Sequence, residues 1–431
     1  MSETALIVTN QSIMQVGTDG AVEYRPGSGV AGGSRLVGAI EVGLLTGGND
    51  RPYALGLASA LAARSICLDF IGSDALDSPE LHNSPFIKFL NFRSDQAEKA
   101  GLERKVIRLL SYYARLIQYA ATSRPRILHI LWNNKFELFD RVILMLYYRL
   151  LGKIAVLTAH NVNSAKRDGR DNFLNRLSLK IQYWLCDHIF VHTERMKGEL
   201  LKDFDIPESK VTVIPFGINN TIPTSEVTTL DAKRRLGLGA EEKTGLFFGQ
   251  IAPYKGLEYL VAAMAALAKQ NEGIRLIVAG KVKRGYAGYW EQIQREIVTL
   301  GIQEQVIERI EFIPDDEVEL YFKAADVVIV PYVDIFQSGV PFLAYSFGLP
   351  VIATDIGSLK EDVLEGKTGY ICKPRDPLDL AASIKSYFSS ELYLGLDKRR
   401  QEIQEFANKK YSWTKVGDIT RGVYTTLLAQ R

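Results

Sequence analysis

The stretch ADVVIVPYVDIFQSGVPFLAYSFGLPVIATDIG, residues Ala325–Gly357, decides the fold of this chain. Its apolar run Val327–Val330 consists of β-branched residues and predicts a buried strand. A second apolar run, Val351–Thr354, predicts another strand. The short apolar helix between them ends at Gly348, which suits a left-handed stop, and Pro350 blocks its continuation. A strand, a helix and a strand in this order form the repeating unit of a parallel α/β sheet.

The start of that helix has a pattern that suits an anion. Ser338 has the chemistry of a helix N-cap, and Pro341 is tolerated in a first turn because its missing N–H would be unpaired there. We expect the N–H groups of Gly339 and Val340 to be free, with Gln337 beside them on the same loop. Free N–H groups at a helix start bind phosphates. The sequence therefore predicts a phosphate-bearing ligand at the carboxyl end of the sheet.

A second loop in this half of the chain also has phosphate-binding chemistry. The predicted strand Thr244–Phe248 ends in Gly249, and Lys255 stands just before the predicted helix Leu257–Lys269. Glycine lets a ligand approach the backbone closely, and lysine supplies a positive charge. We therefore predict that this loop binds the same phosphate-bearing ligand as the helix start at Ser338.

The first half of the chain contains a similar glycine loop. The predicted strand Ile40–Thr46 is followed by Gly47 and Gly48, and then Asp50 and Pro52 mark the start of a helix. The loop has two interpretations that the residues alone leave open. It is either a site where a ligand approaches the backbone or a tight strand–helix turn without a ligand.

A polar cluster follows the predicted strand Ile154–Thr158, at the edge where parallel α/β sheets bind ligands. His160 can hydrogen-bond a sugar hydroxyl or an acceptor, because imidazole both donates and accepts. Asn161 and Arg167 in the same polar region are candidates for an acceptor site. The alternative is a capping or packing histidine. The other histidines beside apolar strand residues are predicted to be structural: His129, His188 and His192.

The composition limits the class of protein. A chain of 431 residues favours two domains, and its net charge of +2 excludes bulk affinity for nucleic acid. The three cysteines, Cys67, Cys186 and Cys372, form no CxxC pair, which is typical of buried thiols in a reducing compartment. The chain starts without the pattern of a secretory signal, and its apolar runs are too broken to span a bilayer. We therefore predict a cytoplasmic protein.

Two predicted helices combine basic and apolar residues. They are Leu102–Ala121, which contains Arg104, Lys105, Arg108 and Arg115, and Val142–Leu151. Such helices suit contact with an anionic membrane surface. Ordinary packed helices with solvated basic edges are the alternative. A peripheral position at the cytoplasmic face of a membrane is therefore consistent with the sequence.

Taken in order from about Ile40 to the C-terminus, these motifs resemble the retaining GT-B glycosyltransferases of family 4, also called glycosyl transferases group 1. The resemblance implies an α/β fold with two Rossmann-like domains facing a central cleft. We expect an irregular extension over 1–34, an acceptor domain over 35–217 and a linker over 218–230. A donor domain then covers 231–409, and a C-terminal helix over 410–431 crosses back to the first domain.

The resemblance also implies roles for single residues in binding the donor. In the family, a histidine at the place of His160 contacts the donor sugar, and the loop at Gly47 and Gly48 lies under the donor phosphates. Lys255 matches the family's lysine at the diphosphate. The backbone near Ile313 is placed at the nucleotide base. Glu361, after a glycine loop, is placed at a sugar or ribose hydroxyl.

Three positions depart from the family pattern. Gln250 stands where relatives usually have arginine, and Lys281, after Gly280, is a candidate replacement charge. Ile335 and Leu343 stand where many relatives have two glutamates. Backbone groups around Ser338, Gly339 and Val340, with the side chain of Gln337, are therefore expected to carry more of the donor recognition.

The expected function is transfer of a sugar from a nucleotide diphosphate sugar, such as a UDP- or GDP-sugar, to a hydroxyl group with retention of configuration. The acceptor is expected to be a polysaccharide, a glycolipid or a lipid-linked precursor, with no cofactor and no metal. The Asp-x-Asp triplet Asp203–Asp205 is expected to lie in a surface turn, away from the donor. The alternatives are an epimerase or a phosphorylase on the same fold, and a non-catalytic protein that binds nucleotide sugars.

Overall fold

The computed structural model describes residues 8–9, 12–13, 39–47, 51–95, 101–134, 136–167, 169–218, 225–335 and 337–431, without the side chains of residues 8–9, 12–13, 102 and 167. The chain divides into two compact units, Met1–Ala39 and Ile40–Arg431. In the first unit, β1 (Val8–Thr9) pairs antiparallel with β2 (Ser12–Ile13). The rest of the predicted extension and residues 219–224 of the predicted linker lie outside the described residues.

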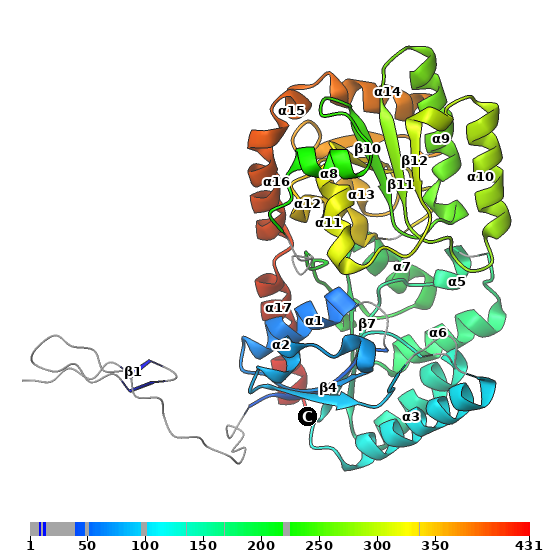
Figure 1. Ribbon diagram of the computed structural model, residues 1–431. Helices are drawn as coiled ribbons and strands as arrows, with labels where there is room; N and C mark the ends of the chain where they lie inside the picture. The colour runs from blue at the N-terminus through cyan, green and yellow to red at the C-terminus, as the bar shows by residue number, and fades with distance from the viewer. Residues whose placement is uncertain are drawn as a thin grey trace, which may run out of the picture. The chain divides into compact units, whose positions relative to one another are not determined.

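The second unit contains two parallel sheets (Figure 1). The seven-stranded sheet has the order β5-β4-β3-β6-β7-β8-β9. Its strands are β3 (Glu41–Leu45), β4 (Cys67–Gly72), β5 (Ile87–Asn91), β6 (Ile127–Ile130), β7 (Ile154–Thr158), β8 (His188–Val191) and β9 (Val211–Val213). The strand order reverses between β3 and β6, and ligands bind at such a switch point in open α/β sheets.

Helices cover both faces of this sheet, because its strands are apolar on both sides. Val42 and Leu44 point into one core, and Leu45 points into the other. The first core is covered by α1 (Arg51–Ala62), α2 (Pro79–His82) and α17 (Trp413–Ala429). The second is covered by α3 (Leu102–Thr122), the π-helix η2 (Phe139–Leu144), α4 (Met145–Leu150), α6 (Phe173–Leu185) and α7 (Glu194–Phe204). Shorter elements are η1 (Asp74–Leu76), α5 (Ser164–Arg167) and η3 (Glu208–Lys210).

The six-stranded sheet has the order β12-β11-β10-β13-β14-β15. Its strands are β10 (Thr244–Phe248), β11 (Arg275–Ala279), β12 (Val306–Arg309), β13 (Val327–Val330), β14 (Val351–Thr354) and β15 (Gly369–Cys372). The helices are α8 (Thr229–Arg235), η4 (Pro253–Lys255), α9 (Leu257–Lys269), α10 (Ala287–Thr299), η5 (Gln303–Gln305), α11 (Asp315–Ala324), α12 (Gly339–Ser346), α13 (Leu359–Asp362), α14 (Pro377–Phe388), α15 (Glu391–Leu394) and α16 (Leu396–Lys410). The two parallel sheets with their helices confirm the predicted α/β architecture.

The last helix, α17, packs against α1 beside the seven-stranded sheet (Figure 1). At its start, the Trp413 ring lies against Gly56 and Gly217, where a Cβ atom would come within 2.2 and 2.3 Å of the indole. Its Nε1–H donates to the Ile218 carbonyl at 2.9 Å. Near its end, the Tyr424 hydroxyl lies 2.6 Å from Nδ1 of the buried His129. The C-terminal helix therefore completes the first core, although it follows the second sheet in the chain.

Candidate functional site

Loops from several strands of the seven-stranded sheet meet at its carboxyl edge. Gly47 follows β3, Trp132 follows β6, and His160 follows β7. Gly47 has a φ of 61°, and a Cβ atom on it would lie 2.7 Å from the Trp132 carbonyl oxygen. A glycine is therefore needed there so that the first loop can pass under the second. Gly48, the other glycine predicted in this loop, lies outside the described residues.

His160 lies between aromatic rings at this edge. Its imidazole stacks on Trp132 with the ring planes 2° apart and the ring centres 4.3 Å apart. The Tyr53 ring meets it edge-on at 4.5 Å. Its Nδ1 lies 3.1 Å from Nε2 of His192, and Nδ1 of His192 lies 3.3 Å from the Ile214 carbonyl oxygen. These contacts hold the ring in one orientation.

The hydrogen bonds assign the tautomer of His160. Because a carbonyl oxygen only accepts, Nδ1 of His192 must donate to Ile214, so Nε2 of the neutral His192 accepts. Nδ1 of His160 must then be the donor, which leaves its Nε2 as an acceptor. Burial, followed by the nearby His192 and His129, lowers the pKa of His160 well below its ordinary value. Nε2 of His160 is buried and has no hydrogen-bond partner among the described residues, so it is a neutral acceptor that is available to a hydroxyl group.

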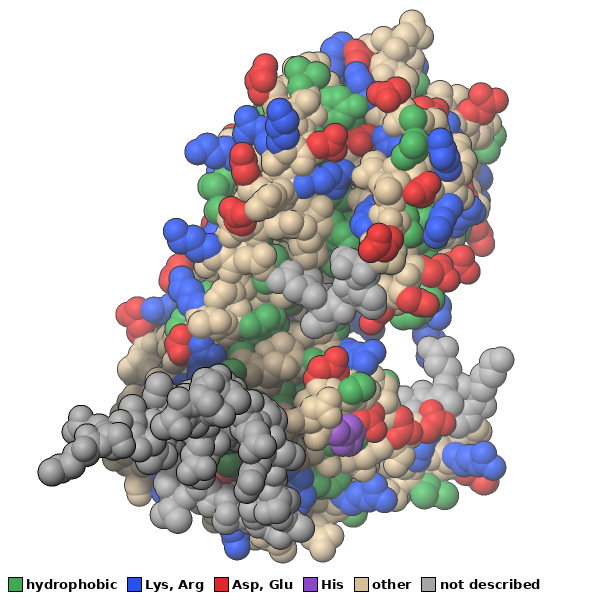
Figure 2. Space-filling view, turned by 60° about the vertical axis from the view of Figure 1, so that its left-hand side comes forward, with side chains coloured by type: hydrophobic (Ala, Val, Ile, Leu, Met, Phe, Trp, Pro, Cys, Tyr) green, Lys and Arg blue, Asp and Glu red, His purple; other side chains and the backbone are tan. Residues whose placement is uncertain are grey.

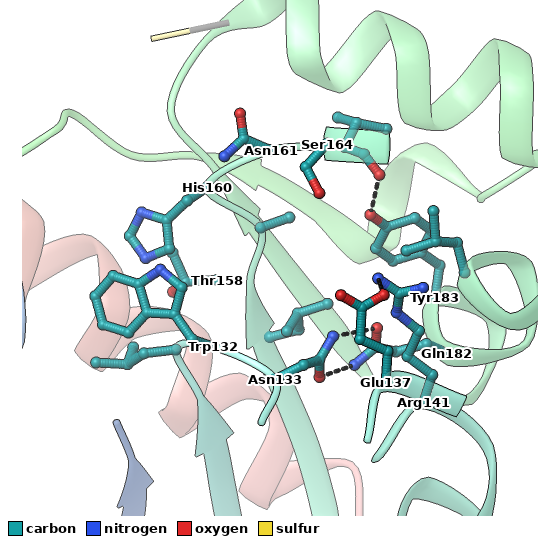
Figure 3. Close-up of a pocket in the computed structure, with 15 residues that line it drawn as sticks. Trp132, Asn133, Glu137, Arg141, Thr158, His160, Asn161, Ser164, Gln182 and Tyr183 are labelled. Carbon is teal, nitrogen blue, oxygen red and sulfur yellow. Dashed lines mark hydrogen bonds and ion pairs between the residues drawn. The ribbon is translucent and has the colours of Figure 1, made fainter. Parts of the chain in front are cut away.

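A cavity of about 210 Å³ opens next to His160 (Figure 3). Its polar wall includes Asn133 and Gln182, whose amides bond each other at 2.7 and 3.0 Å. The wall also includes Arg141, which is buried and bonded to Glu137 at 2.7 Å, while its Nε has no hydrogen-bond partner in the part of the chain that the structure describes. Arg141 lies on the π-helix η2, and such helices occur frequently at functional sites. The half-buried Asn161 lines the cavity too.

The carboxyl edge of the six-stranded sheet holds a buried cation. Only 6% of Lys255 is exposed, and its Nζ donates a long 3.4 Å bond to the Phe248 carbonyl oxygen. The ammonium lies 5.0 Å from the centre of the Tyr332 ring. Within the described part of the chain, Lys255 has no ion pair. Because an uncompensated buried charge is costly, this arrangement is suited to bind an anion.

Glycines make room for that lysine. Gly249 has a φ of 100°, and a Cβ atom on it would lie 2.9 Å from the Lys255 Nζ. Gly280, after β11, has a φ of 145°, and its Cβ would lie 2.0 Å from the Gly249 carbonyl oxygen. The two loops therefore pack with no room for side chains at these positions.

The predicted helix start at Ser338 is present, with one difference. Ser338 caps α12, and its Oγ accepts from the Val340 N–H at 3.2 Å. The expectation that the Val340 N–H is free is therefore wrong in this structure, because the cap occupies it. Gly339 is the exposed first residue of α12, and Oε1 of Gln337 is buried with no hydrogen-bond partner within the described ranges. A ligand at this helix start would meet Gln337 beside the Ser338 cap.

The two edges are linked through Phe216, which follows β9. Its ring stacks on Phe342 of α12 with ring centres 5.3 Å apart, and it lies 5.0 Å from His192. Phe342 belongs to the helix that Ser338 caps, and a Cβ on Gly249 would lie 3.8 Å from Val340 of that helix. The cavity beside His160 and the cation at Lys255 therefore belong to one connected region.

Other residues predicted from sequence lie at the margin of this region. Gln250, Lys281 and Glu361 are exposed, and no structural contact assigns them a role. Ile313 is buried in the loop between β12 and α11. The apolar residues of Ile310–Ile313 predict a strand from sequence, but this prediction is wrong, because the strand β12 ends before them, at Arg309. The side chain of Arg167 lies outside the described residues.

The two aspartates of the Asp-x-Asp triplet are exposed, as the predicted surface location requires, but they lie at the end of a helix rather than in a turn. Asp203 lies in the last turn of α7, 3.9 Å from Lys166, and Asp205 caps that helix with a φ of 57°. Phe204 between them is buried. In the described part of the chain, no group of three or more His, Cys, Asp or Glu residues is arranged to hold a metal.

Sequence reasoning missed several residues of the region. It assigned His192 a structural role, although His192 bonds His160. It did not single out Trp132, Arg141, Gln182 or Tyr332. Trp132 directly follows the apolar run Ile127–Leu131, whose pattern predicts a strand. Its position at the end of a strand could therefore have marked it as a candidate site residue. Gln182 and Tyr332 are brought into this region by contacts between segments that are distant in sequence, and Arg141 is brought there by the π-helix η2.

Comparison with known proteins identifies relatives of both halves. Residues 52–221 match the family model of Glycosyltransferase Family 4, and residues 229–410 match that of Glycosyl transferases group 1. Over 427 residues, or 93% of this chain and 86% of the relative, the sequence is 23% identical to a D-inositol 3-phosphate glycosyltransferase of Geodermatophilus obscurus. It is 29% identical to an uncharacterized glycosyltransferase of Methanocaldococcus jannaschii over 248 residues, which span 56% of this chain and only 60% of that protein.

A solved structure, Anabaena HepE in complex with UDP and glucose, has the same fold. Its TM-score is 0.68 at 17% sequence identity, and the match covers 90% of this chain and 99% of that one. At this identity the likeness establishes the fold alone.

Proposed function

This chain belongs to the glycosyltransferases of group 1 and family 4, with the GT-B fold, and we propose that it transfers a sugar from a nucleotide diphosphate sugar to a hydroxyl group with retention of configuration. The structure with UDP and glucose bound to a protein of this fold supports a UDP-sugar as donor. In this proposal the nucleotide sugar is consumed as a substrate, and no cofactor takes part in the reaction.

The observation that carries this proposal is the buried cation of Lys255. Cleavage of the bond to the sugar leaves negative charge on the departing diphosphate. A preorganised cation in a site shielded from water stabilises that charge where it develops. Lys255 has no ion pair in the described residues, so an incoming diphosphate would be its first charged partner. The N-terminal end of α12 adds a favourable dipole nearby.

The role of His160 follows from its tautomer. Nε2 accepts a hydrogen bond from a hydroxyl of the donor sugar, which fixes the sugar beside the cavity. Because His160 is neutral, it orients a hydroxyl without adding a second positive charge. A hydroxyl of the acceptor reaches the same place from the cavity lined by Asn133, Arg141 and Gln182. Paired amides and a guanidinium suit a polyhydroxylated acceptor, such as a carbohydrate or a lipid-linked sugar.

The proposed transfer needs no divalent metal, because Lys255 supplies the charge that a metal would otherwise place at the diphosphate. It takes place in the cytoplasm. The buried free thiols of Cys67, Cys186 and Cys372 suit that reducing compartment.

The experiment has two stages. Thermal unfolding is first measured with UDP-glucose, UDP-GlcNAc, UDP-galactose and GDP-mannose, because a ligand that binds the folded state raises the melting temperature by mass action. The best donor is then incubated with candidate acceptors in excess EDTA, and products are followed by mass spectrometry. We expect a glycosylated acceptor and free nucleoside diphosphate. Conversion of the donor sugar without an acceptor would identify an epimerase, and binding without turnover would identify a non-catalytic protein.

A further inference from the structure

Three neighbouring helical segments that cover the second core expose large hydrophobic side chains. On α3, Ile107 and Leu110 are 62% and 60% exposed. On α4, Leu150 is 86% exposed, and on α6, Phe173 and Trp184 are 76% and 63% exposed. Most exposed large hydrophobic side chains of the described residues lie in the segment from α3 to α6. Contiguous exposed apolar surface on a folded protein marks an interaction site.

Contacts between these segments show that they form one layer. The rings of Tyr113 on α3 and Phe139 on η2 have centres 5.1 Å apart. The Tyr147 hydroxyl on α4 donates to a carbonyl oxygen of α3 at 3.2 Å. Arg149 on α4 lies over the Trp184 ring of α6 at 6.0 Å. The segments share one core on one face of the seven-stranded sheet. We call the outer side of α3, α4 and α6 the layer surface.

The layer surface is also basic. The charged residues of α3 are Arg104, Lys105, Arg108 and Arg115, with Glu103 as the single acid. The α4 helix adds Arg149, and α6 adds Lys180 and Arg176, of which Arg176 is paired at 2.6 Å with Asp171 just before the helix. The whole chain, in contrast, has nearly equal numbers of basic and acidic residues, 52 and 50. Positive charge is therefore concentrated where the apolar side chains are exposed.

The opposite face of the same sheet has a different character. Among the described residues of α1 and α17, no large hydrophobic side chain is strongly exposed. Figure 2, which brings the left-hand side of Figure 1 forward, shows acidic and basic side chains interspersed over the upper part of the molecule, around the six-stranded sheet. Within the described residues, exposed large hydrophobic side chains are therefore concentrated on the layer surface, although single ones such as Phe312 and Leu378 are exposed elsewhere.

We propose that the layer surface docks on an anionic lipid bilayer, with the apolar side chains in the interface and the basic ones at the headgroups. Amphipathic helices rich in Lys and Arg, with Trp, Phe and Leu between them, bind membranes in this way. A second copy would bring like charges together. None of the described helices is long and apolar enough to cross a bilayer, so the contact is peripheral.

Docking would bring the cavity beside His160 close to the bilayer. The α6 helix exposes Phe173 and Trp184 on one side, and its Gln182 and Tyr183 line that cavity on the other. An acceptor hydroxyl carried on a lipid would then reach the cavity from the membrane. This step rests on the proposed function, whereas docking itself does not.

The test is sedimentation of the purified full chain with vesicles, without nucleotide. Neutral phosphatidylcholine vesicles are compared with vesicles that contain about 30% phosphatidylglycerol. We expect binding only to the anionic vesicles, and its loss at about 0.5 M NaCl because salt screens the attraction. Equal binding to both kinds of vesicle, or no binding to the anionic ones, would overturn the proposal.

Single substitutions test whether the layer surface is the part of the protein that binds the vesicles. Arg104→Glu and Lys180→Glu each remove a basic residue, and each should weaken binding by about fivefold or more. Leu150→Gln and Trp184→Gln should also weaken it, whereas Leu378→Gln is the matched control, because Leu378 is 73% exposed on α14 of the other sheet. Thermal unfolding verifies that each variant is folded. If Leu150→Gln and Leu378→Gln bind vesicles equally, the layer surface is not the docking site.

Two further measurements separate the alternatives. Lys255→Ala should bind vesicles like the wild type, so a failure of the proposed function leaves the docking result intact. Sedimentation equilibrium without vesicles reports self-association. A dimer that Trp184→Gln dissociates would show that the layer surface is a protein interface and would contradict membrane docking.

Discussion

The carboxyl edges of the two sheets have opposite chemistry. The edge of the seven-stranded sheet carries neutral imidazoles and aromatic rings around His160. The edge of the six-stranded sheet carries the buried cation of Lys255 beside the start of α12. All histidines of the chain lie before β9, so the second sheet has none. The difference teaches that one edge offers a neutral hydrogen-bond acceptor and the other a buried positive charge, which is why we propose that the first binds hydroxyl groups and the second an anion.

The largest expected effect comes from removing the cation. Lys255→Ala should lower the rate of transfer by about a hundredfold or more, because charge on the departing diphosphate is no longer stabilised. Steady-state rates of sugar transfer measure this. Lys281→Ala is the control, since Lys281 is exposed, and its rate should stay close to that of the wild type. Equal losses in both variants would mean that the loop at Lys255 is not a distinct anion site.

A smaller effect is expected at the other edge. His160→Ala removes the acceptor at Nε2, so turnover should fall by about tenfold or more, while affinity for the bare nucleoside diphosphate stays unchanged. His82→Ala is the matched control, because His82 is exposed and bonded to Asp77 rather than to the site. Loss of nucleotide affinity in a folded His160→Ala variant would place His160 at the phosphates and remove the distinction between the edges.

The smallest effect is expected from pH. Burial lowers the pKa of His160, so its neutral form persists below pH 6.5, where an ordinary histidine would begin to gain a proton. The rate of transfer should therefore change by less than about twofold between about pH 8 and pH 6. A pH–rate profile of the wild type tests this. A steep fall as the pH drops through about 6.5 would show that a histidine of ordinary pKa controls the step.

The sequence predicted the fold because alternating apolar runs and helix signals are local. Val327–Val330 and Val351–Thr354 were placed correctly, since both strands are buried on both sides. The strand at Ile310–Ile313 was misplaced because the real one, Val306–Arg309, lies at the edge of its sheet and is half-exposed. Its sequence, VIER, therefore carries little apolar signal.

The candidate site was predicted less completely than the fold. His160, Lys255 and Ser338 stand directly after strands or at helix starts, so position along the chain identified them. His192 and Phe216 join the site through contacts that depend on strand order, which no local pattern records. Arg141 was not predicted as a site residue, because the sequence of the π-helix that positions it cannot be told from that of an ordinary helix.

The most direct test of the division between the edges is isothermal titration of UDP into the wild type, Lys255→Ala and His160→Ala. The account predicts that Lys255→Ala weakens UDP binding by about tenfold or more, while His160→Ala binds UDP as the wild type does. Equal affinities in all three proteins, or a larger loss in His160→Ala than in Lys255→Ala, would contradict it.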